Sequence, residues 1–303
     1  MRRMTKHDDQ GIATILVVLM MPLLVLFGAL VFDGGRGVLA RRQTQNAADA
    51  GALAKATDCA LSRSPTVFTA YQTNGAVLSN SPTCGVGTTT VTMTKNISFL
   101  FRPGGGNADV SRSATANWAT LGTATTTAIT ISKCEFTEQL LNGSTDITLY
   151  LDDPKPQSGC SSLPGGFSQL QSTGCTVTAI AGGFVPGDPG GDVHKQVPCI
   201  TNPDPAQPDL PYSVLIPIYD SDACKAAGCN GHGPYKILGF AMFKVTGYSF
   251  NGNAYDGTLG KKCPDDKDRG KYCLRGDFIR FVISQGTPGT STDFGAFRVY
   301  LAS

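Results

Sequence analysis

Histidine is scarce in this chain, and none of the common catalytic motifs occurs in it. The only histidines are His7, His194 and His232. There is no Gly-x-Ser-x-Gly elbow, no HExxH helix and no Walker loop. Glu135 and Glu138 are the candidates for a catalytic acid and base pair, yet no feature of the sequence distinguishes them from surface carboxylates. We therefore expect no enzyme, no catalytic residue and no cofactor.

Most of the chain also lacks a net charge. From Cys59 to Ser303 there are 18 Lys plus Arg and 18 Asp plus Glu. Such a balance argues against nucleic acid or another highly charged polymer as a partner. Hydrophobic residues make up 41% of the chain, which is enough for a packed core. We expect a globular domain and not a disordered stalk.

Charge is absent altogether from residues 11–32, GIATILVVLMMPLLVLFGALVF. A bilayer core about 30 Å thick needs roughly 20 helical residues, so this run can span it. A cleaved signal sequence has an apolar region of only about 7 to 15 residues, followed by a small-x-small site, and residues 30–33 offer no such site. We expect a retained transmembrane helix over residues 11–32.

Cysteine usage sets the expected orientation. Positive charges do not, because three precede the run and three follow it closely: Arg2, Arg3, Lys6, Arg36, Arg41 and Arg42. All ten cysteines follow the run, and disulfides persist outside the cytosol. We therefore expect a cytoplasmic tail at residues 1–10 and an extracytoplasmic domain, in a single-pass protein of the plasma membrane.

The ten cysteines are disulfide candidates, and their spacing leaves most pairings open. They are Cys59, Cys84, Cys134, Cys160, Cys175, Cys199, Cys224, Cys229, Cys263 and Cys273. Cys59 can tie the end of a helix to the loop at Cys84. Cys263 and Cys273 flank a polar loop that a local bridge would pin.

Two clusters invite a metal interpretation. Cys224-x4-Cys229-x2-His232 resembles a ligand spacing, but structural zinc sites place two residues between paired cysteines, so we favour a disulfide. Residues 265–268 carry three aspartates without the spacing of a calcium loop, and Lys267 lies among them. We expect a solvated loop there and no metal site.

Residues 33–61 are dense in strong helix formers and predict a juxtamembrane helix. Steps of three or four residues pick out a narrow small-residue stripe: Leu39, Gln43, Ala47, Ala50, Ala54, Thr57 and Leu61. Such a stripe lets another backbone approach closely, either in the chain's own domain or in a neighbouring subunit. We take the interaction residues to be Arg41, Arg42, Gln43, Ala47, Ala50, Leu53 and Ala54. Glycines at positions 34, 35 and 37 predict a hinge where the chain leaves the membrane.

From residue 62 onward, short runs rich in Thr and Val alternate with turn residues, which is typical of a sheet. The expected strands are 88–93, 97–101, 111–118, 125–131, 147–151, 214–218, 237–246, 278–284 and 297–301. Residues 88–94 are almost free of apolar side chains on one face, which predicts a half-exposed antiparallel strand. The expected fold class is α+β: a long N-terminal helix, then a mainly antiparallel, disulfide-stapled domain over residues 62–303. A proline-rich segment at 201–211 is a possible subdivision.

The order of motifs in residues 10–56 resembles the TadG-like proteins of the Flp (tight adherence) pilus system. An apolar span is followed by Asp33-Gly34-Gly35-Arg36, then by ARRQ at 40–43 and QNAADAGALA at 45–54. Segments such as ITIS at 129–132 and VLIPIYD at 214–220 resemble actinobacterial members. The resemblance implies a bacterial membrane-anchored protein that works with pilus-assembly components.

Two departures limit what the resemblance implies. Relatives with metal-dependent adhesion use Asp-x-Ser-x-Ser, and the serines are missing at LYLDDP, residues 149–154. Pseudopilins have a glycine before the span and a glutamate five residues after it, whereas here Gly11 is followed at that distance by Leu16. We expect neither metal-dependent adhesion nor removal of the tail.

The leading hypothesis is a membrane-anchored, non-enzymatic component of Flp-type pilus assembly or a related secretion apparatus. Its expected partners are the membrane and other pilus-assembly membrane proteins or pseudopilins. The alternative is a stand-alone, surface-anchored binding or adhesion module for a glycan or peptide.

Overall fold

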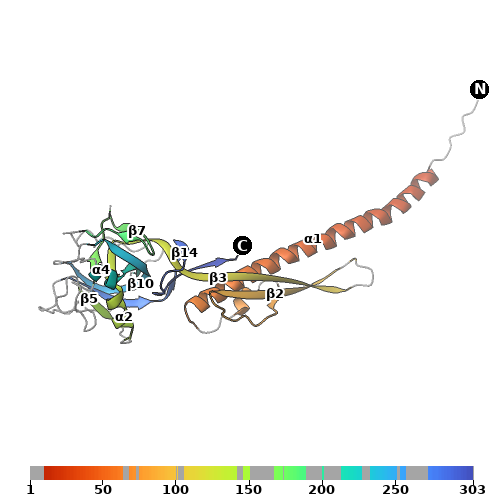
Figure 1. Cartoon of the computed structure of the whole chain (residues 1–303). Coiled ribbons are helices and arrows are strands. Elements are labelled where there is room, and N and C mark those ends of the chain that lie inside the picture. The colour runs from red at the N-terminus through yellow and green to blue at the C-terminus, as the bar shows by residue number, and fades with distance from the viewer. Residues whose placement is uncertain are drawn as a thin grey trace, which may run out of the picture. The chain divides into compact units, whose positions relative to one another are not determined.

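The computed structural model describes residues 10–63, 68–72, 75–99, 101, 106–141, 146–150, 167–172, 174–188, 200, 213–226, 233–250, 253–256 and 272–302 (Figure 1). The chain divides into two compact units. The first consists of Met1–Lys55, Pro65–Ala116 and Leu301–Ser303, and the second of Ala56–Ser64 and Asn117–Tyr300.

Helix α1 is continuous over Gln10–Ala60, 51 residues that extend about 75 Å. The apolar run and the alanine-rich segment therefore belong to one helix, and the glycines at 34, 35 and 37 do not end it. By length and composition α1 can cross a membrane: its most apolar window has a mean hydropathy of 3.0 and is 0% buried. This part of the chain fits a single-pass membrane anchor.

The first unit adds a short 3-10 helix, η1 (Phe68–Tyr71), and three strands, β1 (Ala76–Leu78), β2 (Thr88–Ser98) and the first half of β3 (Asn107–Thr127). β1 pairs antiparallel with β2, which neighbours β3. Side-chain hydrogen bonds join β2 to β3 along the exposed face, as in the pairs Thr90–Thr115, Thr92–Ser113, Thr94–Ser111 and Asn96–Asp109. Val91 and Met93 are buried on the opposite face. This arrangement matches the half-exposed strand predicted for residues 88–94.

The second unit contains one complete sheet and part of another, which also includes β1 and β2 of the first unit. One has the order β5-β12-β10-β9-β4-β6, with β8 and β11 also paired to β10. Its strands are β4 (Ile129–Ser132), β5 (Ile147–Tyr150), β6 (Phe167–Gln169), β8 (Phe184–Val185), β9 (Ser213–Tyr219), β10 (Tyr235–Phe250), β11 (Asn253–Asp256) and β12 (Cys273–Ile279). Its pairings are antiparallel except for β4 with β9.

The other sheet has the order β1-β2-β3-β15-β13, with β7 and β14 also paired to β3. Its remaining strands are β7 (Thr176–Ile180), β13 (Phe281–Val282), β14 (Thr287–Gly289) and β15 (Ala296–Leu301). The long strand β3 enters both units, because the boundary between them falls after Ala116.

Two apolar clusters form the core of the second unit. In the first, Ile131 of β4, Ile216 of β9 and Phe243 of β10 pack with Phe136 of helix α2 (Lys133–Leu141). The second joins the two sheets, since it includes Phe240 of β10 together with residues of β3, β7 and β15: Leu121, Ala124, Ala179 and Ala296. Alternate residues of β9 and β10 therefore serve different clusters, which is the arrangement of a sheet covered on both faces.

The expected fold class is confirmed: a long apolar N-terminal helix precedes a mainly antiparallel, sheet-rich region. A disulfide joins Cys59 to Cys84, as proposed from the sequence. Cys134, Cys175, Cys224 and Cys273 are disulfide-bonded as well. The other four cysteines and the segments at 201–211 and 265–268 lie outside the described residues.

Some elements differ from the prediction. β2 ends at Ser98, so the strand expected over residues 97–101 stops short. Helices α2 and α4 (Ser221–Ala226) were not predicted. Both are short and begin at polar capping residues, so they carry little apolar periodicity for a sequence argument to detect.

Candidate functional site: helix α1 and the β2–β3 hairpin

One face of the C-terminal half of α1 is buried in the first unit, and it is made of small residues. It consists of Ala40, Thr44, Ala47, Ala48, Gly51 and Ala52. Spacings of three and four residues place them on one side of the helix. Small side chains bring the helix axis close to whatever covers them, here the hairpin of β2 and β3. Figure 1 shows this half of α1 running beside β2 and β3.

Gly51 marks the closest approach of α1 to the hairpin. A Cβ on Gly51 would lie 3.1 Å from the Met93 Cε and 3.2 Å from a Val91 Cγ atom, with the ring of Phe68 at 3.7 Å. Glycine in a helix costs about 1 kcal/mol relative to alanine, so a helical glycine usually has a packing reason. Here the reason is contact with β2.

Two hydrogen bonds involve the edge of this interface. The Lys95 ammonium donates to the Gln43 side-chain oxygen at 2.7 Å, which joins β2 to α1. The Thr44 hydroxyl donates to the Ala40 carbonyl at 2.8 Å, so a buried polar group is satisfied within the helix.

The hairpin also contacts α1 where the apolar run ends. The Phe101 backbone N–H donates to the Asp33 carboxylate at 3.0 Å. The rings of Phe101 and Phe32 meet edge to face with their centroids 6.4 Å apart. On the helix, the Arg36 guanidinium lies 5.8 Å from the centre of the Phe32 ring. The boundary between apolar and polar sequence in α1 is thus also the place where the end of the hairpin reaches the helix.

A groove of about 810 Å³ lies between this part of α1 and the hairpin. The helix contributes Leu26, Phe27, Ala29, Leu30, Asp33, Gly34, Gly37, Val38 and Arg41. The hairpin contributes Ile97, Phe99, Phe101, Ala108, Asp109 and Val110. Apolar residues predominate along its length, and the three charged residues are Asp33, Asp109 and Arg41.

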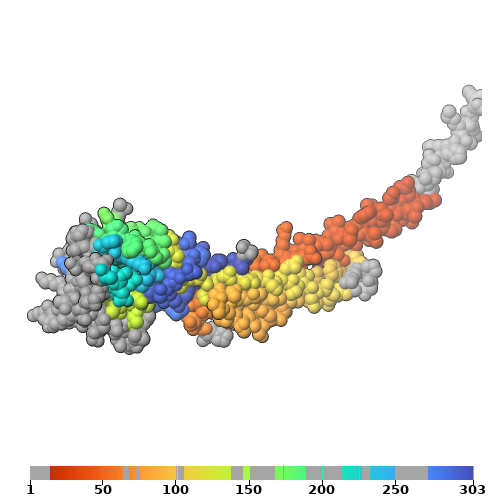
Figure 2. Space-filling model, viewed as in Figure 1, coloured from red at the N-terminus to blue at the C-terminus, as the bar shows by residue number. Residues whose placement is uncertain are grey.

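Before the groove, the N-terminal part of α1 has no other described segment against it. Large apolar side chains are exposed here; for example, Leu19 is 70% and Leu24 68% exposed. Figure 2 shows this part of the helix, in red, projecting beyond the hairpin, in yellow and orange. An exposed apolar surface of this extent needs a lipid or protein environment.

The residues predicted for interaction lie on different sides of α1. Ala47 is buried, Gln43 is half-buried and bonded to Lys95, and Ala50 is exposed. Arg41 and Arg42 are exposed, and Leu53 and Ala54 are half-buried. The buried stripe is offset from the one read in the sequence, which stepped through Ala50 and Ala54 instead of Ala48 and Gly51. Alanine and glycine fill every side of this helix, so composition gave no means of choosing the phase.

Glu135 has a structural place in the second unit. It is buried in the first turn of α2, and its backbone N–H donates to the Ser132 hydroxyl at 3.0 Å, which is an N-cap. Nearby, burial and the neighbouring Tyr235 raise the pKa of Tyr219 far above its usual value. His194 and the side chain of Glu138 lie outside the described residues. Among the residues that are described, no three His, Cys, Asp or Glu side chains form a group that could hold a metal ion.

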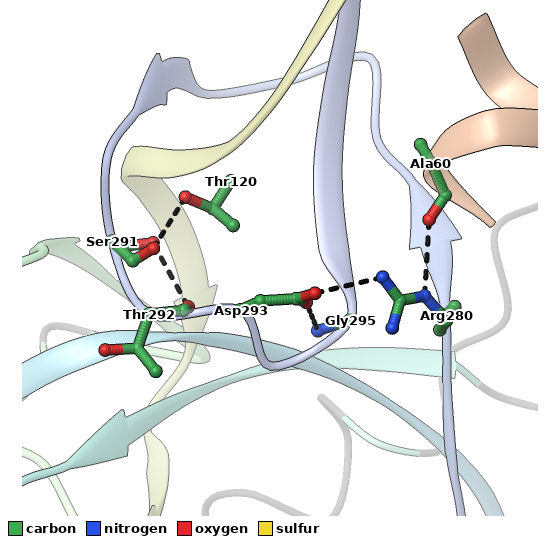
Figure 3. A network of polar contacts seen from close by, with 7 residues as sticks. All are labelled: Ala60, Thr120, Arg280, Ser291, Thr292, Asp293 and Gly295. Carbon is green, nitrogen blue, oxygen red and sulfur yellow. Dashed lines mark hydrogen bonds and ion pairs between the residues drawn. The ribbon is translucent and has the colours of Figure 1, made fainter. Parts of the chain in front are cut away.

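The last turn of α1 is fixed within the second unit by Arg280. Its Nε donates to the Ala60 carbonyl at 3.2 Å and its terminal nitrogen to the Asp293 carboxylate at 3.0 Å (Figure 3). The same carboxyl group accepts the Gly295 N–H at 2.8 Å. The Arg280 guanidinium also lies 4.9 Å from the centre of the Phe297 ring. A cation on the last carbonyls of a helix satisfies groups that have no partner within the helix.

A long helix, apolar and exposed in its first half and packed on a sheet in its second, fits a single-pass membrane anchor attached to a folded domain. Residues 11–57 match the Tad family, described as Flp pilus-assembly TadE/G-like. The match confirms the resemblance seen in residues 10–56 and supports a role related to pilus assembly, while the actinobacterial resemblance at 129–132 and 214–220 stays a prediction. No curated protein and no solved structure matches the chain.

Proposed function

We propose that this protein is a single-pass, non-enzymatic component of a Flp-type pilus assembly or related secretion apparatus. The observation that carries the proposal is the division of α1 into an open apolar half and a half packed on β2 and β3. The family match spans both halves, from residue 11 to residue 57. A structure that served only as a tether would not need the second half to be built for close packing.

The proposed topology places residues 1–10 in the cytoplasm and the sheet region outside the plasma membrane. Disulfides support this orientation, since the six described cysteines are all bonded and such bonds persist in oxidising compartments. The domain boundaries remain those of the sequence, with the transmembrane segment at 11–32, the juxtamembrane segment at 33–61 and the sheet-rich domain at 62–303.

The proposed contact with partner membrane proteins uses the side of α1 that the hairpin leaves open. Arg42, Asn46 and Ala50 are exposed there at helical spacing. They lie on the same helix, from about 15 Å beyond the membrane segment onward, so a partner helix that extends past the membrane could contact this face. Leu53 lies on the same face by helical phase, whereas Arg41 lines the groove on the hairpin side.

A non-enzymatic role is supported by the place of Glu135, whose burial beside an N-cap explains it without catalysis. The neighbouring Tyr219 is buried too, and burial raises its pKa further above the physiological range. Neither group is offered to solvent as an acid or base would be.

Deletion of the gene, followed by complementation, tests the proposal. We expect loss of surface pili, attachment or secretion, and recovery of pilus-assembly membrane proteins with the natural chain from detergent extracts. Ala50→Trp on the open face should reduce that recovery, whereas Thr90→Val on the exposed face of the hairpin should not. Unchanged pili, attachment and secretion after deletion would overturn the proposal. Recovery of a lone monomer that binds wall glycan would favour the binding-module alternative.

A further inference from the structure

The groove between α1 and the hairpin extends across the expected surface of the membrane. Leu26, Phe27 and Leu30 belong to the apolar run, whereas Val38 and Arg41 lie after its end at Phe32. The apolar lining does not stop with the run, because Ile97, Phe99 and Val110 extend it. Apolar surface that continues past the membrane boundary would face water unless something covers it.

We propose that one anionic phospholipid from the surrounding bilayer occupies this groove. This inference rests on the membrane placement proposed above. Its acyl chains would lie against Leu26, Leu30 and the hairpin residues Phe99 and Val110, with its phosphate near Arg41.

Size supports a lipid as the occupant. The groove's 810 Å³ falls in the range of about 300–1,000 Å³ that is typical of small-molecule sites. From Leu26 to Arg41 the helix rises about 22 Å, of which about 9 Å lies within the apolar run and the rest beyond Phe32.

The glycines of α1 explain why the groove is open. Gly34 and Gly37 line it, and a Cβ on either would meet nothing within 4 Å. Together with Leu26, Leu30 and Arg41 they form one face at steps of three and four residues. The sequence alone favoured a hinge at these glycines, yet the helix continues through them, and side chains there would project into the groove.

Charge favours an anionic headgroup. Arg41 lies at the outer end, and Arg36 and Lys95 line the adjoining recess. The groove and the recess together carry these three cations against two acids, Asp33, which accepts the Phe101 N–H, and Asp109, which accepts the Asn96 amide. A phosphate near Arg41 would gain a charge-assisted hydrogen bond.

The experiment uses the full chain in nanodiscs of mixed phosphatidylcholine and phosphatidylglycerol, followed by native mass spectrometry from a mild detergent. We expect one phosphatidylglycerol retained per natural chain. Gly37→Leu should lower that retention at least about tenfold by filling the groove, and Val110→Trp should do the same from the hairpin side. Gly35→Leu is the matched control, because Gly35 has equal space around it but does not line the groove.

A second pair of variants tests the headgroup. Arg41→Gln should remove the preference for phosphatidylglycerol over phosphatidylcholine, whereas Arg42→Gln, which lies outside the groove, should keep it. Equal lipid retention by the natural chain, Gly37→Leu and Val110→Trp would overturn the proposal. Dimers of the chain without lipid would also overturn it, in favour of a second copy in the groove.

Alkaline extraction of cell membranes separates this inference from the proposed function. A chain that resists extraction but retains no lipid contradicts only the groove. A chain released by alkali contradicts the membrane anchor as well.

Discussion

Gly51 of α1 lies against Met93 of β2 so closely that a Cβ on the glycine would come within 3.1 Å of the methionine Cε. Met93 is fully buried, and its thioether end is the most adaptable group at this contact. The separation of helix and hairpin is therefore set by the missing side chain at one position of α1.

Gly51→Leu should destabilise the first unit. Overpacking a buried contact costs about 1–3 kcal/mol, which exceeds the gain of about 1 kcal/mol from replacing a helical glycine. The measurement is the thermal unfolding midpoint of the full chain in detergent, followed by circular dichroism. Gly35→Leu gives the same change where nothing lies within 4 Å, so its midpoint should not fall. Equal midpoints for the two variants would contradict the packing argument.

Substitutions at Ala47 and Ala50 should separate folding from partner binding. Ala47 is 3% exposed on the hairpin side, so Ala47→Leu should cost about 1–3 kcal/mol of stability. Ala50 is exposed, and Ala50→Leu should leave the free energy of unfolding within about 0.5 kcal/mol of that of the natural chain. Under the proposed function, Ala50→Leu still reduces recovery of partner membrane proteins. A loss of stability at Ala50 with none at Ala47 would reverse the assignment of faces.

The membrane run and the sheet-rich class could be predicted because each depends on patterns that local sequence carries. An apolar run of 22 uncharged residues is typical of a transmembrane helix. Thr89, Val91 and Met93 alternate with exposed threonines, as a half-buried strand requires. The Cys59–Cys84 pairing was suggested from position alone and is confirmed.

The face of α1 and the groove could not be predicted. The helical phase depends on which small residue meets β2, and Ala48 and Ala50 are identical in every local property. The groove is lined by Phe99 and Val110 of the hairpin together with Leu26 of the helix, residues more than seventy positions apart in the sequence. The sequence suggested a hinge at Gly34 and Gly37. That these glycines line a groove depends on the hairpin opposite them, which the local sequence does not reveal.

Arg280→Ala should weaken the attachment of the last turn of α1 in the second unit. The variant loses the hydrogen bonds to the Ala60 carbonyl and Asp293 and the contact with the Phe297 ring. Both charged side chains are partly exposed, at 44% and 47%, so we expect a loss of only about 1–2 kcal/mol. Arg280→Lys should restore only part of the lost stability. The ammonium keeps the positive charge but lacks the planar fork that reaches both acceptors. Hydrogen exchange at the amides of residues 57–61 measures the fraying directly. Arg63→Gln, at an exposed arginine nearby, should leave that exchange unchanged.

Removing the Cys59–Cys84 disulfide should destabilise the chain without abolishing the fold of α1. The bond closes a loop of about 26 residues, for which the chain-entropy model gives about 3–4 kcal/mol. The double variant Cys59→Ala/Cys84→Ala should therefore unfold at a lower urea concentration than the natural chain. Cys59→Ser alone should expose one additional reactive thiol, because Cys84 is exposed at the surface and loses its partner. If the single variant shows no new thiol before denaturation, Cys84 has another partner, and the loop estimate no longer applies. If the double variant unfolds at the same urea concentration as the natural chain, the disulfide of the natural chain does not stabilise it by constraining the unfolded state.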